Sequence, residues 1–287
     1  MTALWRSMRP TQWVKNLVVF AGLIFSRHFD RIDDIWRSLA AFGVFCAMAS
    51  AIYLFNDVRD RESDRAHPDK RHRPIASGKL SVGVATAAAC VLALGGFVGA
   101  WALGPTLVVT IAVYALLNVI YSLGLKHVAI IDVMIVAMGF VLRAVGGAEA
   151  IDVKISPWLV VCTLLLALFL GFGKRRWELV ALGDNATSHR ASLASYSTHL
   201  LDQLISVTTA STVVAYALYT LAPETQTKFG TDQLIWTLPF VLFGVFRYLY
   251  LIHGARKGGN PTSVLLRDWP MLATGLLWLA AVLYIIA

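Results

Sequence analysis

The chain has 287 residues, of which 57% are apolar and only 15% are charged, and its mean hydropathy is +0.66. A soluble domain carries roughly 25% charged residues, so this composition excludes an ordinary soluble protein and predicts an integral membrane protein. The net charge of +8 is better explained by attraction to anionic lipid headgroups than by nucleic-acid binding.

Long apolar segments recur along the whole chain. A bilayer core of about 30 Å requires about 20 mainly apolar residues for each helical crossing. Nine segments qualify, near residues 13–29, 35–55, 80–103, 104–122, 128–149, 156–173, 200–223, 233–254 and 268–286. Gly104 and Pro105 break helices and predict a tight turn between the third and fourth. We therefore predict an all-α, polytopic membrane protein, a nine-helix bundle with polar cytoplasmic loops, forming one domain over residues 1–287.

The first segment is too polar at Lys15 and Asn16 for a signal peptide, and no small-residue cleavage site follows it, so we expect it to be retained.

Most of the 25 lysines and arginines lie in the N-terminus and in the connections after the second, fourth, sixth and eighth segments. Basic loops stay on the cytoplasmic side. We expect a cytoplasmic N-terminus, an active site facing the cytoplasm, and location in the inner (plasma) membrane.

Three aspartates follow the second segment with a spacing of i, i+3 and i+7: Asp57, Asp60 and Asp64. On a continuous helix of about 3.6 residues per turn they would share one stripe. With Asn56 they offer only oxygen ligands, which select Mg²⁺ and the phosphates it carries. The competing interpretation is a solvated helix end with pairs such as Asp57 and Arg61. It leaves the like-charged neighbours Asp60 and Asp64 unexplained, so we favour a metal site.

A second polar stretch follows the sixth segment and begins with Lys174, Arg175 and Arg176. It is mainly basic, whereas the first is rich in aspartate. Guanidinium and ammonium groups bind phosphate, although each could equally anchor the membrane orientation. Tyr121 and Lys126, at the end of the fourth segment, are similarly either phosphate contacts or interface anchors. The predicted substrate phosphate-binding residues are Lys15, Tyr121, Lys126, Lys174, Arg175, Glu178 and Arg190.

Two ionisable residues fall inside the fifth segment, Asp132 and Arg143, eleven positions apart and therefore on one helix face. Gly139 and Gly146 near Arg143 permit close helix approach, so we expect Arg143 to face the bundle interior. Whether it meets a substrate or another buried group stays open. Cys46, Cys90 and Cys162 show no paired or metal-ligand spacing and are interpreted as small core residues.

The run Asn56-Asp57-Val58-Arg59-Asp60-Arg61-Glu62-Ser63-Asp64, followed by Arg73-Pro74-Ile75-Ala76-Ser77-Gly78, resembles the first signature of the UbiA-type intramembrane prenyltransferase superfamily. That resemblance implies a nine-helix fold and a prenyl diphosphate bound between two aspartate-rich loops. The second loop departs from the pattern: Gly173-Lys174-Arg175-Arg176-Trp177-Glu178-Leu179 and a lone Asp184 stand where further aspartates are expected.

Together with residues 9–16 and 121–126, this basic loop resembles the decaprenyl-phosphate phosphoribosyltransferase branch of the superfamily. The resemblance implies Mg²⁺-dependent transfer of 5-phosphoribose from phosphoribosyl diphosphate to a polyprenyl phosphate, giving a lipid-linked precursor of cell-wall arabinan. Asn56, Asp57, Asp60 and Asp64 would be the catalytic metal ligands. A conventional prenyltransferase is the alternative. A transporter ranks lower, since few ionisable residues lie in the spans. The oligomeric state is not predicted.

Overall fold

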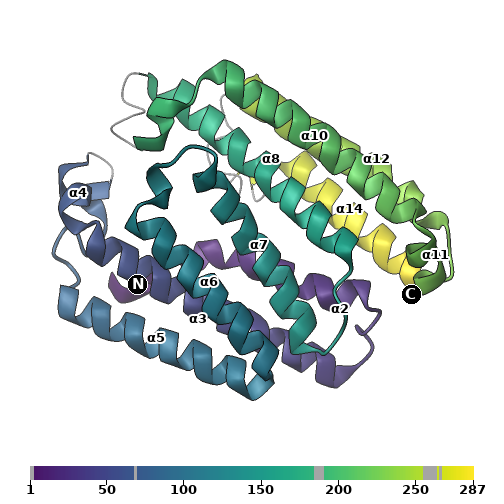
Figure 1. The fold of residues 1–287 in the computed structure, drawn as a ribbon, viewed down its shortest axis with the longest axis horizontal. Coiled ribbons are helices and arrows are strands. Elements are labelled where there is room, and N and C mark those ends of the chain that lie inside the picture. Colours follow the sequence, from purple (N-terminus) through teal and green to yellow (C-terminus); the bar gives the residue numbers. More distant parts are fainter. Residues whose placement is uncertain (1–2, 68–69, 184–190, 255–263, 265–266) are drawn as a thin grey trace. The chain divides into compact units, whose positions relative to one another are not determined.

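The computed structural model describes residues 3–67, 70–183, 191–254, 264 and 267–287, and all regular structure within them is helical (Figure 1), which confirms the all-α prediction. The longer elements are η1 (Pro10–Phe20, a 3₁₀ helix), α3 (Ile32–Arg59), α5 (Val82–Leu103), α6 (Pro105–Leu123), α7 (Ile131–Ala150), α8 (Pro157–Leu182), α10 (Thr198–Leu221), α12 (Leu238–His253) and α14 (Trp269–Ile286). The shorter ones are α1 (Ala3–Met8), α2 (Ala21–Phe25), α4 (Arg61–Ala66), η2 (Lys70–His72), η3 (Leu125–His127), η5 (Ala191–Ser195), α11 (Pro223–Phe229) and η6 (Gln233–Thr237).

Eight helices in the described part of the chain are long and apolar enough to cross a bilayer: α3, α5, α6, α7, α8, α10, α14, and η6 taken together with α12. The chain is therefore a multi-pass membrane protein, but the predicted count of nine is not confirmed. The segment predicted at 13–29 forms instead η1 and the short α2. Pro10 opens η1, and Asn16 within it is buried against other polar side chains rather than exposed to lipid.

Two boundaries show how local chemistry adjusts the spans. The turn predicted at Gly104 and Pro105 is confirmed: Gly104 has φ 149°, open only to glycine, and Pro105 starts α6. The sixth span was predicted to end at residue 173, yet α8 continues to Leu182, so Lys174, Arg175 and Glu178 lie on a helix and not in a loop. Arg175 and Glu178 pair at i, i+3, which stabilises a charged helical turn beyond the apolar stretch.

The chain divides into two compact units. Unit 1 contains residues 1–125 and 142–155, and unit 2 contains residues 126–141 and 156–287, so the division passes through α7. A single functional domain stays a prediction.

Unit 1 is built on α3, which lies beside α5 and also contacts η1 and α6 (Figure 1). Its core contains Phe45 and Met48 of α3 with Leu107 and Ile111 of α6. The second half of α7 approaches η1 backbone to backbone, because a Cβ atom added at Gly147 would lie 1.9 Å from the Val19 carbonyl oxygen. Only glycine permits that approach.

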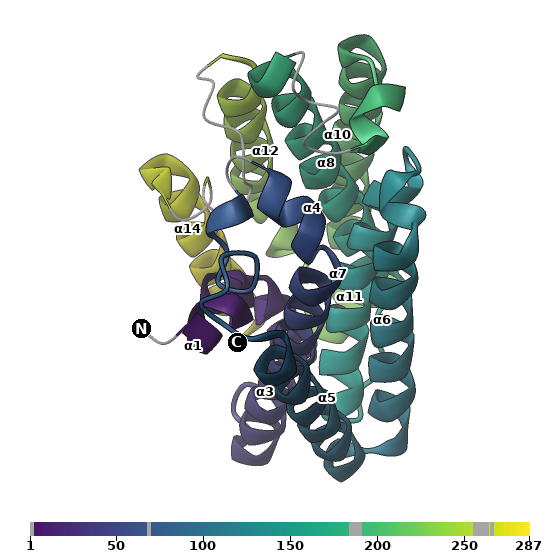
Figure 2. The same cartoon turned by 90° about the vertical axis from the view of Figure 1, so that its left-hand side faces the viewer.

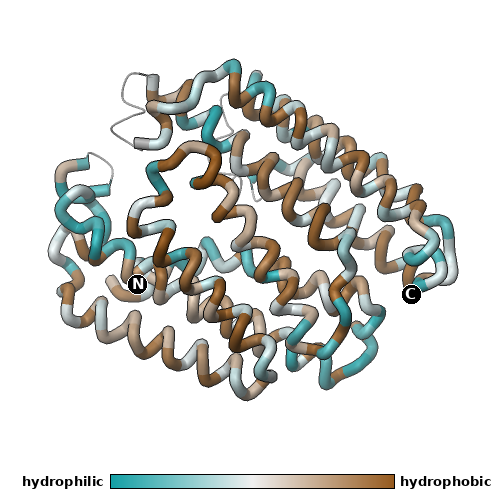
Figure 3. Tube along the Cα trace, in the orientation of Figure 1, coloured by the Kyte–Doolittle hydropathy of each residue, from teal (hydrophilic) through white to brown (hydrophobic). Residues whose placement is uncertain are grey.

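Unit 2 is built on α8 and α10, which lie side by side, with α12 packed on both and α14 packed on α12 (Figure 1). Phe169, Leu201, Ile205 and Tyr248 form the centre of its core. Apolar residues dominate the long helices of both units, whereas hydrophilic residues gather on α4 and the segment that follows it (Figure 3). An apolar outer surface over long helices is the pattern of a protein solvated by lipid.

Candidate functional site

The predicted acidic cluster lies where α3 ends and α4 begins. Asn56 and Asp57 are in the last turn of α3, and Asp64 is on α4, which lies beyond the end of α3 (Figure 2). The prediction of one uninterrupted helical stripe is wrong. Asp60 adopts φ −86° and ψ 8° between the two helices, and the Ser63 hydroxyl donates to its carbonyl oxygen at 2.8 Å. A local side-chain bond of this kind competes with helix continuation.

Arg73 joins two of the three aspartates. Its Nη1 atom lies 3.1 Å from Asp57 Oδ1 and 2.7 Å from Asp64 Oδ2. Both carboxylates are buried, with exposed fractions of 2% and 3%. Carboxylates removed from water need a compensating charge, and charge-assisted bonds to a guanidinium supply it. Asp57 and Asp64 are therefore brought together around a guanidinium of the protein itself, and their role as metal ligands stays a prediction.

The segment after η2 fixes Arg73 in place. Ile75 is fully buried with Leu54 of α3 and Leu80 in one small apolar cluster. The Ser77 amide donates to the Arg73 carbonyl at 2.9 Å, and Gly78 closes the turn with φ +77°. The run Arg73-Pro74-Ile75-Ala76-Ser77-Gly78 thus uses Ile75 as an anchor that holds the arginine against the acids.

Arg9 supplies a second guanidinium from the other end of the sequence. Its Nη2 atom lies 2.5 Å from Asp57 Oδ1, and the guanidinium stacks over the Tyr53 ring, 4.9 Å from the centroid. The Arg9 backbone is in the left-handed region at φ 54°, an uncommon conformation for a side-chain-bearing residue. Sequence reasoning did not assign a role to Arg9 or Arg73, although both stand in the motifs that carried the family resemblance.

The donor set of this cluster fits a hard divalent cation. Within the residues described here, Asp57 Oδ2 and Asp64 Oδ1 accept no hydrogen bond, so one oxygen of each carboxylate is left to a ligand. No group of three or more acidic, histidine or cysteine side chains in the described residues converges as a complete protein cage. Mg²⁺ sites that bind substrate phosphates commonly use one or two carboxylates, with phosphate oxygens and waters completing the shell.

Asn56 is held by a different neighbour. Its side-chain oxygen accepts a hydrogen bond from the Ser122 hydroxyl of α6 at 2.5 Å. This bond orients the amide at the end of α3 and ties α6 to the acidic cluster. Tyr121, the adjacent predicted phosphate contact, is half-buried near the end of α6.

Unit 2 contains a second buried charge network, centred on Asp132. The Arg175 Nε atom donates to Asp132 Oδ2 at 2.8 Å, and Arg175 Nη1 donates to Glu178 Oε2 at 2.9 Å. Asp132 is 0% exposed and Arg175 only 4%. Lys174 Nζ lies 3.6 Å from Glu178 Oε1 and is the more exposed of the two cations. The geometry gives Arg175 and Glu178 a supporting position and leaves Lys174 nearer the solvent.

Asp132 also fastens the segment before α10. The Tyr196 hydroxyl donates to Asp132 Oδ1 at 2.8 Å and accepts from the Ile130 amide at 2.5 Å, while the Ser192 hydroxyl lies 3.1 Å from Asp132 Oδ2. Burial raises the pKa of the Tyr196 phenol well above its ordinary value, and the nearby Asp132 charge raises it further. The phenol therefore stays a proton donor to the carboxylate.

Arg143 is bound inside unit 1. Its Nε atom donates to Asn16 Oδ1 at 2.6 Å, and its Nη2 atom donates to the Tyr114 hydroxyl at 2.7 Å. The guanidinium also lies over the Tyr114 ring, 4.9 Å from the centroid. The sequence left open whether Arg143 meets a substrate or another buried group. The structure shows it bonded to buried groups of the protein. The predicted interior orientation of Arg143 is confirmed.

The remaining predicted residues lie on several elements. Lys15 is half-buried on η1, and Lys126 is half-buried on η3. Arg190 and Asp184 lie outside the described residues. The predicted meeting of the acidic cluster with the basic residues of α8 joins residues of different units and stays a prediction.

Comparison with known proteins places these features in a family context. Residues 17–262 match the family model described as the UbiA prenyltransferase family. The chain is 34% identical to the decaprenyl-phosphate phosphoribosyltransferase of Mycolicibacterium smegmatis, over 98% of this chain and 91% of that protein. It is 36% identical to the protein of the same name from Corynebacterium glutamicum, over 95% of this chain and 83% of that protein.

The fold has solved counterparts as well. A UbiA homolog from Archaeoglobus fulgidus, determined bound to GPP and Mg²⁺, superposes with a TM-score of 0.75 at 17% identity, covering 99% of each chain. Because the sequences are only 17% identical, this structural similarity shows a common fold alone.

Proposed function

The chain belongs to the UbiA prenyltransferase family, and we propose that it transfers 5-phosphoribose from phosphoribosyl diphosphate to a polyprenyl phosphate such as decaprenyl phosphate. The observation that carries this proposal is the near full-length similarity to two proteins named for that activity. The product would be a lipid-linked phosphoribose, and by the same resemblance a precursor of cell-wall arabinan.

The acidic cluster supports the donor half of the reaction. Asn56, Asp57, Asp60 and Asp64 would hold Mg²⁺ against the diphosphate of the donor. When bound, the ion would neutralise charge on the departing diphosphate. Arg9 and Arg73 lie against the same carboxylates, and guanidinium groups bind phosphate oxygens in pairs. One cluster thus offers both oxygen donors for a cation and cationic donors for phosphate.

The chemistry demands little acid or base catalysis. The bond between the anomeric carbon and the diphosphate breaks, and an oxygen of the lipid phosphate forms the new bond to that carbon. Because the lipid phosphate is already ionised, no general base is required. Attack opposite the leaving group would invert the anomeric centre, through a transition state resembling an oxocarbenium ion.

The basic residues would position the additional phosphates. Phosphoribosyl diphosphate carries a 5-phosphate that a prenyl diphosphate lacks, and the acceptor adds another phosphate. Lys15, Lys126, Lys174 and Arg190 are the proposed contacts, together with Tyr121. In view of their burial, Arg175 and Glu178 would act by orienting Lys174.

We place the protein in the plasma membrane with the N-terminus and this chemistry on the cytoplasmic side, following the distribution of basic residues.

The test uses purified protein in detergent with labelled phosphoribosyl diphosphate, a polyprenyl phosphate and Mg²⁺. We expect label in the lipid phase, its loss on chelation with EDTA, and its return with added Mg²⁺. Activity on a prenyl diphosphate without phosphoribosyl transfer would instead identify a conventional prenyltransferase.

Single substitutions locate the metal ligands. Asp57→Asn and Asp60→Asn should each lower turnover by at least about 100-fold, the order of effect expected when a metal ion no longer stabilises the charge of the leaving group. Both variants should keep a cooperative thermal unfolding transition. Glu62→Gln is the matched control, since Glu62 belongs to the same turn and its side chain is 75% exposed. Near-normal turnover in either aspartate variant would overturn the metal assignment.

A further inference from the structure

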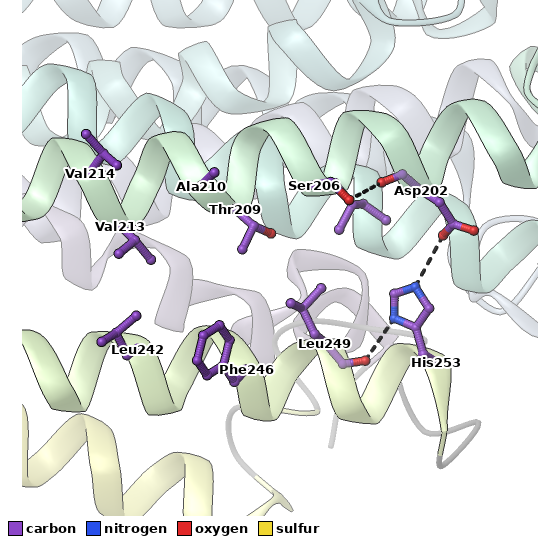
Figure 4. Close-up of a pocket in the computed structure, with 11 residues that line it drawn as sticks. Asp202, Ser206, Thr209, Ala210, Val213, Val214, Leu242, Phe246, Leu249 and His253 are labelled. Carbon is purple, nitrogen blue, oxygen red and sulfur yellow. Dashed lines mark hydrogen bonds and ion pairs between the residues drawn. The ribbon is translucent and has the colours of Figure 1, made fainter.

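A groove in unit 2 lies between α10 and α12, and none of the residues that line it is assigned to the proposed reaction. Its volume is about 660 Å³, and its walls are mostly apolar: Val213 of α10 faces Leu242 of α12 (Figure 4), and Val214, Phe246 and Leu249 also line the groove. Phe246 and Val214 are more than half exposed. In a membrane protein an apolar groove with such an open side faces the lipid chains.

One end of the groove is polar. Asp202 and His253 line that end and contact each other, with 3.2 Å between His253 Nε2 and Asp202 Oδ1 (Figure 4). Arg176 of α8 donates from Nε to the same Asp202 oxygen and from Nη1 to the Ile252 carbonyl at 3.3 Å. An arginine has five N–H donors, so this guanidinium keeps donors for a phosphate beside the groove.

The polar end also lies at the depth of a lipid headgroup. Asp202 is in the first turns of α10 and His253 is the last residue of α12. From Asp202 to Val214 the groove follows twelve helical rises of about 1.5 Å, or about 18 Å. One leaflet of a hydrocarbon core of about 30 Å is about 15 Å deep. The groove thus runs from the headgroup level through one leaflet.

A hydroxyl inside the groove lacks a protein partner. The Thr209 Oγ1 atom is buried and has no hydrogen-bond partner among the described residues, and the Thr209 side chain lines the groove between the polar end and Val213. Buried hydroxyls are nearly always satisfied. Neighbouring hydroxyls of α10 show the alternative, since Thr208 donates to the Leu204 carbonyl at 2.8 Å. An ester carbonyl beneath a lipid headgroup would accept from Thr209.

We propose that this groove is a binding site for one acyl chain of a membrane glycerophospholipid, with the lipid phosphate beside His253 and Arg176. The size of the groove matches this occupant. A methylene group is about as large as a water molecule, whose share of liquid volume is about 30 Å³, so 660 Å³ holds about 20 chain carbons. That matches one fatty acyl chain, whereas most of a decaprenyl chain would extend beyond the groove.

The proposal does not rest on the enzymatic function, and its test needs no turnover. Full-length protein would be reconstituted in vesicles of phosphatidylethanolamine and phosphatidylglycerol containing a phospholipid with a photoreactive diazirine on one acyl chain. After irradiation, mass spectrometry of the peptides locates the label. We expect label concentrated on residues 205–214 and 242–249, above the level on other lipid-exposed helices.

Ala210→Phe fills the groove and should reduce this label about five-fold or more, a loss of roughly 1 kcal/mol in binding. Val207→Phe is the matched control, because Val207 is on the same helix, 63% exposed and outside the groove. Val214→Trp blocks the groove from its open side and provides a second variant if Ala210→Phe does not fold.

Three outcomes would overturn the assignment. Label spread evenly over the exposed helices would indicate surrounding bilayer lipid only. Label unchanged by both groove-filling variants would place the chain elsewhere. Displacement of the probe by polyprenyl phosphate at lower concentrations than by unlabelled phospholipid would assign the groove to the isoprenoid acceptor.

Discussion

Arg73 and Asp64 form the shortest ion pair that Arg73 makes, with 2.7 Å between Nη1 and Oδ2. The same nitrogen reaches Asp57, so one guanidinium compensates two buried carboxylates. We expect Arg73→Gln to lower the free energy of unfolding by about 1 kcal/mol, well below the value for a fully buried pair, because the arginine side chain is 31% exposed. Thermal unfolding in detergent measures the change.

The control for Arg73 is Arg71→Gln, since Arg71 is exposed in the same segment. It should unfold like the wild type. Equal stability of Arg73→Gln and Arg71→Gln would mean that the contacts of Arg73 with Asp57 and Asp64 contribute nothing measurable.

The acidic cluster also shows how far sequence reasoning reaches. The oxygen donors were predicted from their spacing, because helical periodicity relates residues three or four positions apart. Their partners were missed. Arg73 is 16 positions from Asp57, and Arg9 is 48 positions away. Contacts at that separation depend on tertiary packing, here on the burial of Ile75 against Leu54, and no local pattern encodes them.

The fold was predicted to a similar degree. Eight spans follow directly from hydropathy, whose cause is the cost of leaving polar groups in lipid. The errors occur where polar residues are satisfied inside the protein. Asn16 interrupts the first apolar segment yet is buried, bonded to Arg143. Lys174 and Arg175 end the apolar stretch of α8 but not the helix, because Asp132 and Glu178 compensate the charge of Arg175.

Asp132→Asn should be destabilising. It would remove one of the two carboxylates that compensate the buried Arg175 guanidinium. Removing one member of an isolated buried pair costs about 3–5 kcal/mol, and the cost here should fall below that range because Glu178 keeps its bond to Arg175. We expect a lower unfolding temperature and reduced yield of folded protein. Asp152→Asn, at an exposed position with φ 55° that asparagine tolerates, provides a comparison of identical chemistry. Similar unfolding temperatures for the two variants would contradict the network.

The titration of Tyr196 should make the stability of the folded protein depend on pH in the alkaline range. Its pKa is raised in the folded protein above the ordinary value of 10.0, so the folded state keeps a proton that the unfolded state releases. The stabilisation is complete below pH 10 and is lost as the pH rises towards the folded-state pKa.

We therefore expect the unfolding temperature of wild type to fall above pH 10 more steeply than that of Tyr196→Phe. At pH 7 the phenylalanine variant should be less stable by about 1–2 kcal/mol, since it loses two hydrogen bonds of the hydroxyl. Parallel alkaline slopes for the two proteins would show that Tyr196 does not titrate as described.

The packing of η1 on α7 provides the most stringent test of unit 1. A Cβ atom at Gly147 would lie 1.9 Å from the Val19 carbonyl oxygen, a backbone atom that cannot rotate away. Gly147→Ala should therefore displace η1 and cost at least about 3 kcal/mol, the upper range for overpacking. Gly95→Ala in α5 is the opposite case, because nothing lies within 4 Å of its added Cβ atom. There the gain in helix propensity should stabilise by about 0.5–1 kcal/mol. Since both changes add one methyl group to a helical glycine, only the surroundings differ. If both variants unfolded at the wild-type temperature or above, the close contact between η1 and α7 would be refuted.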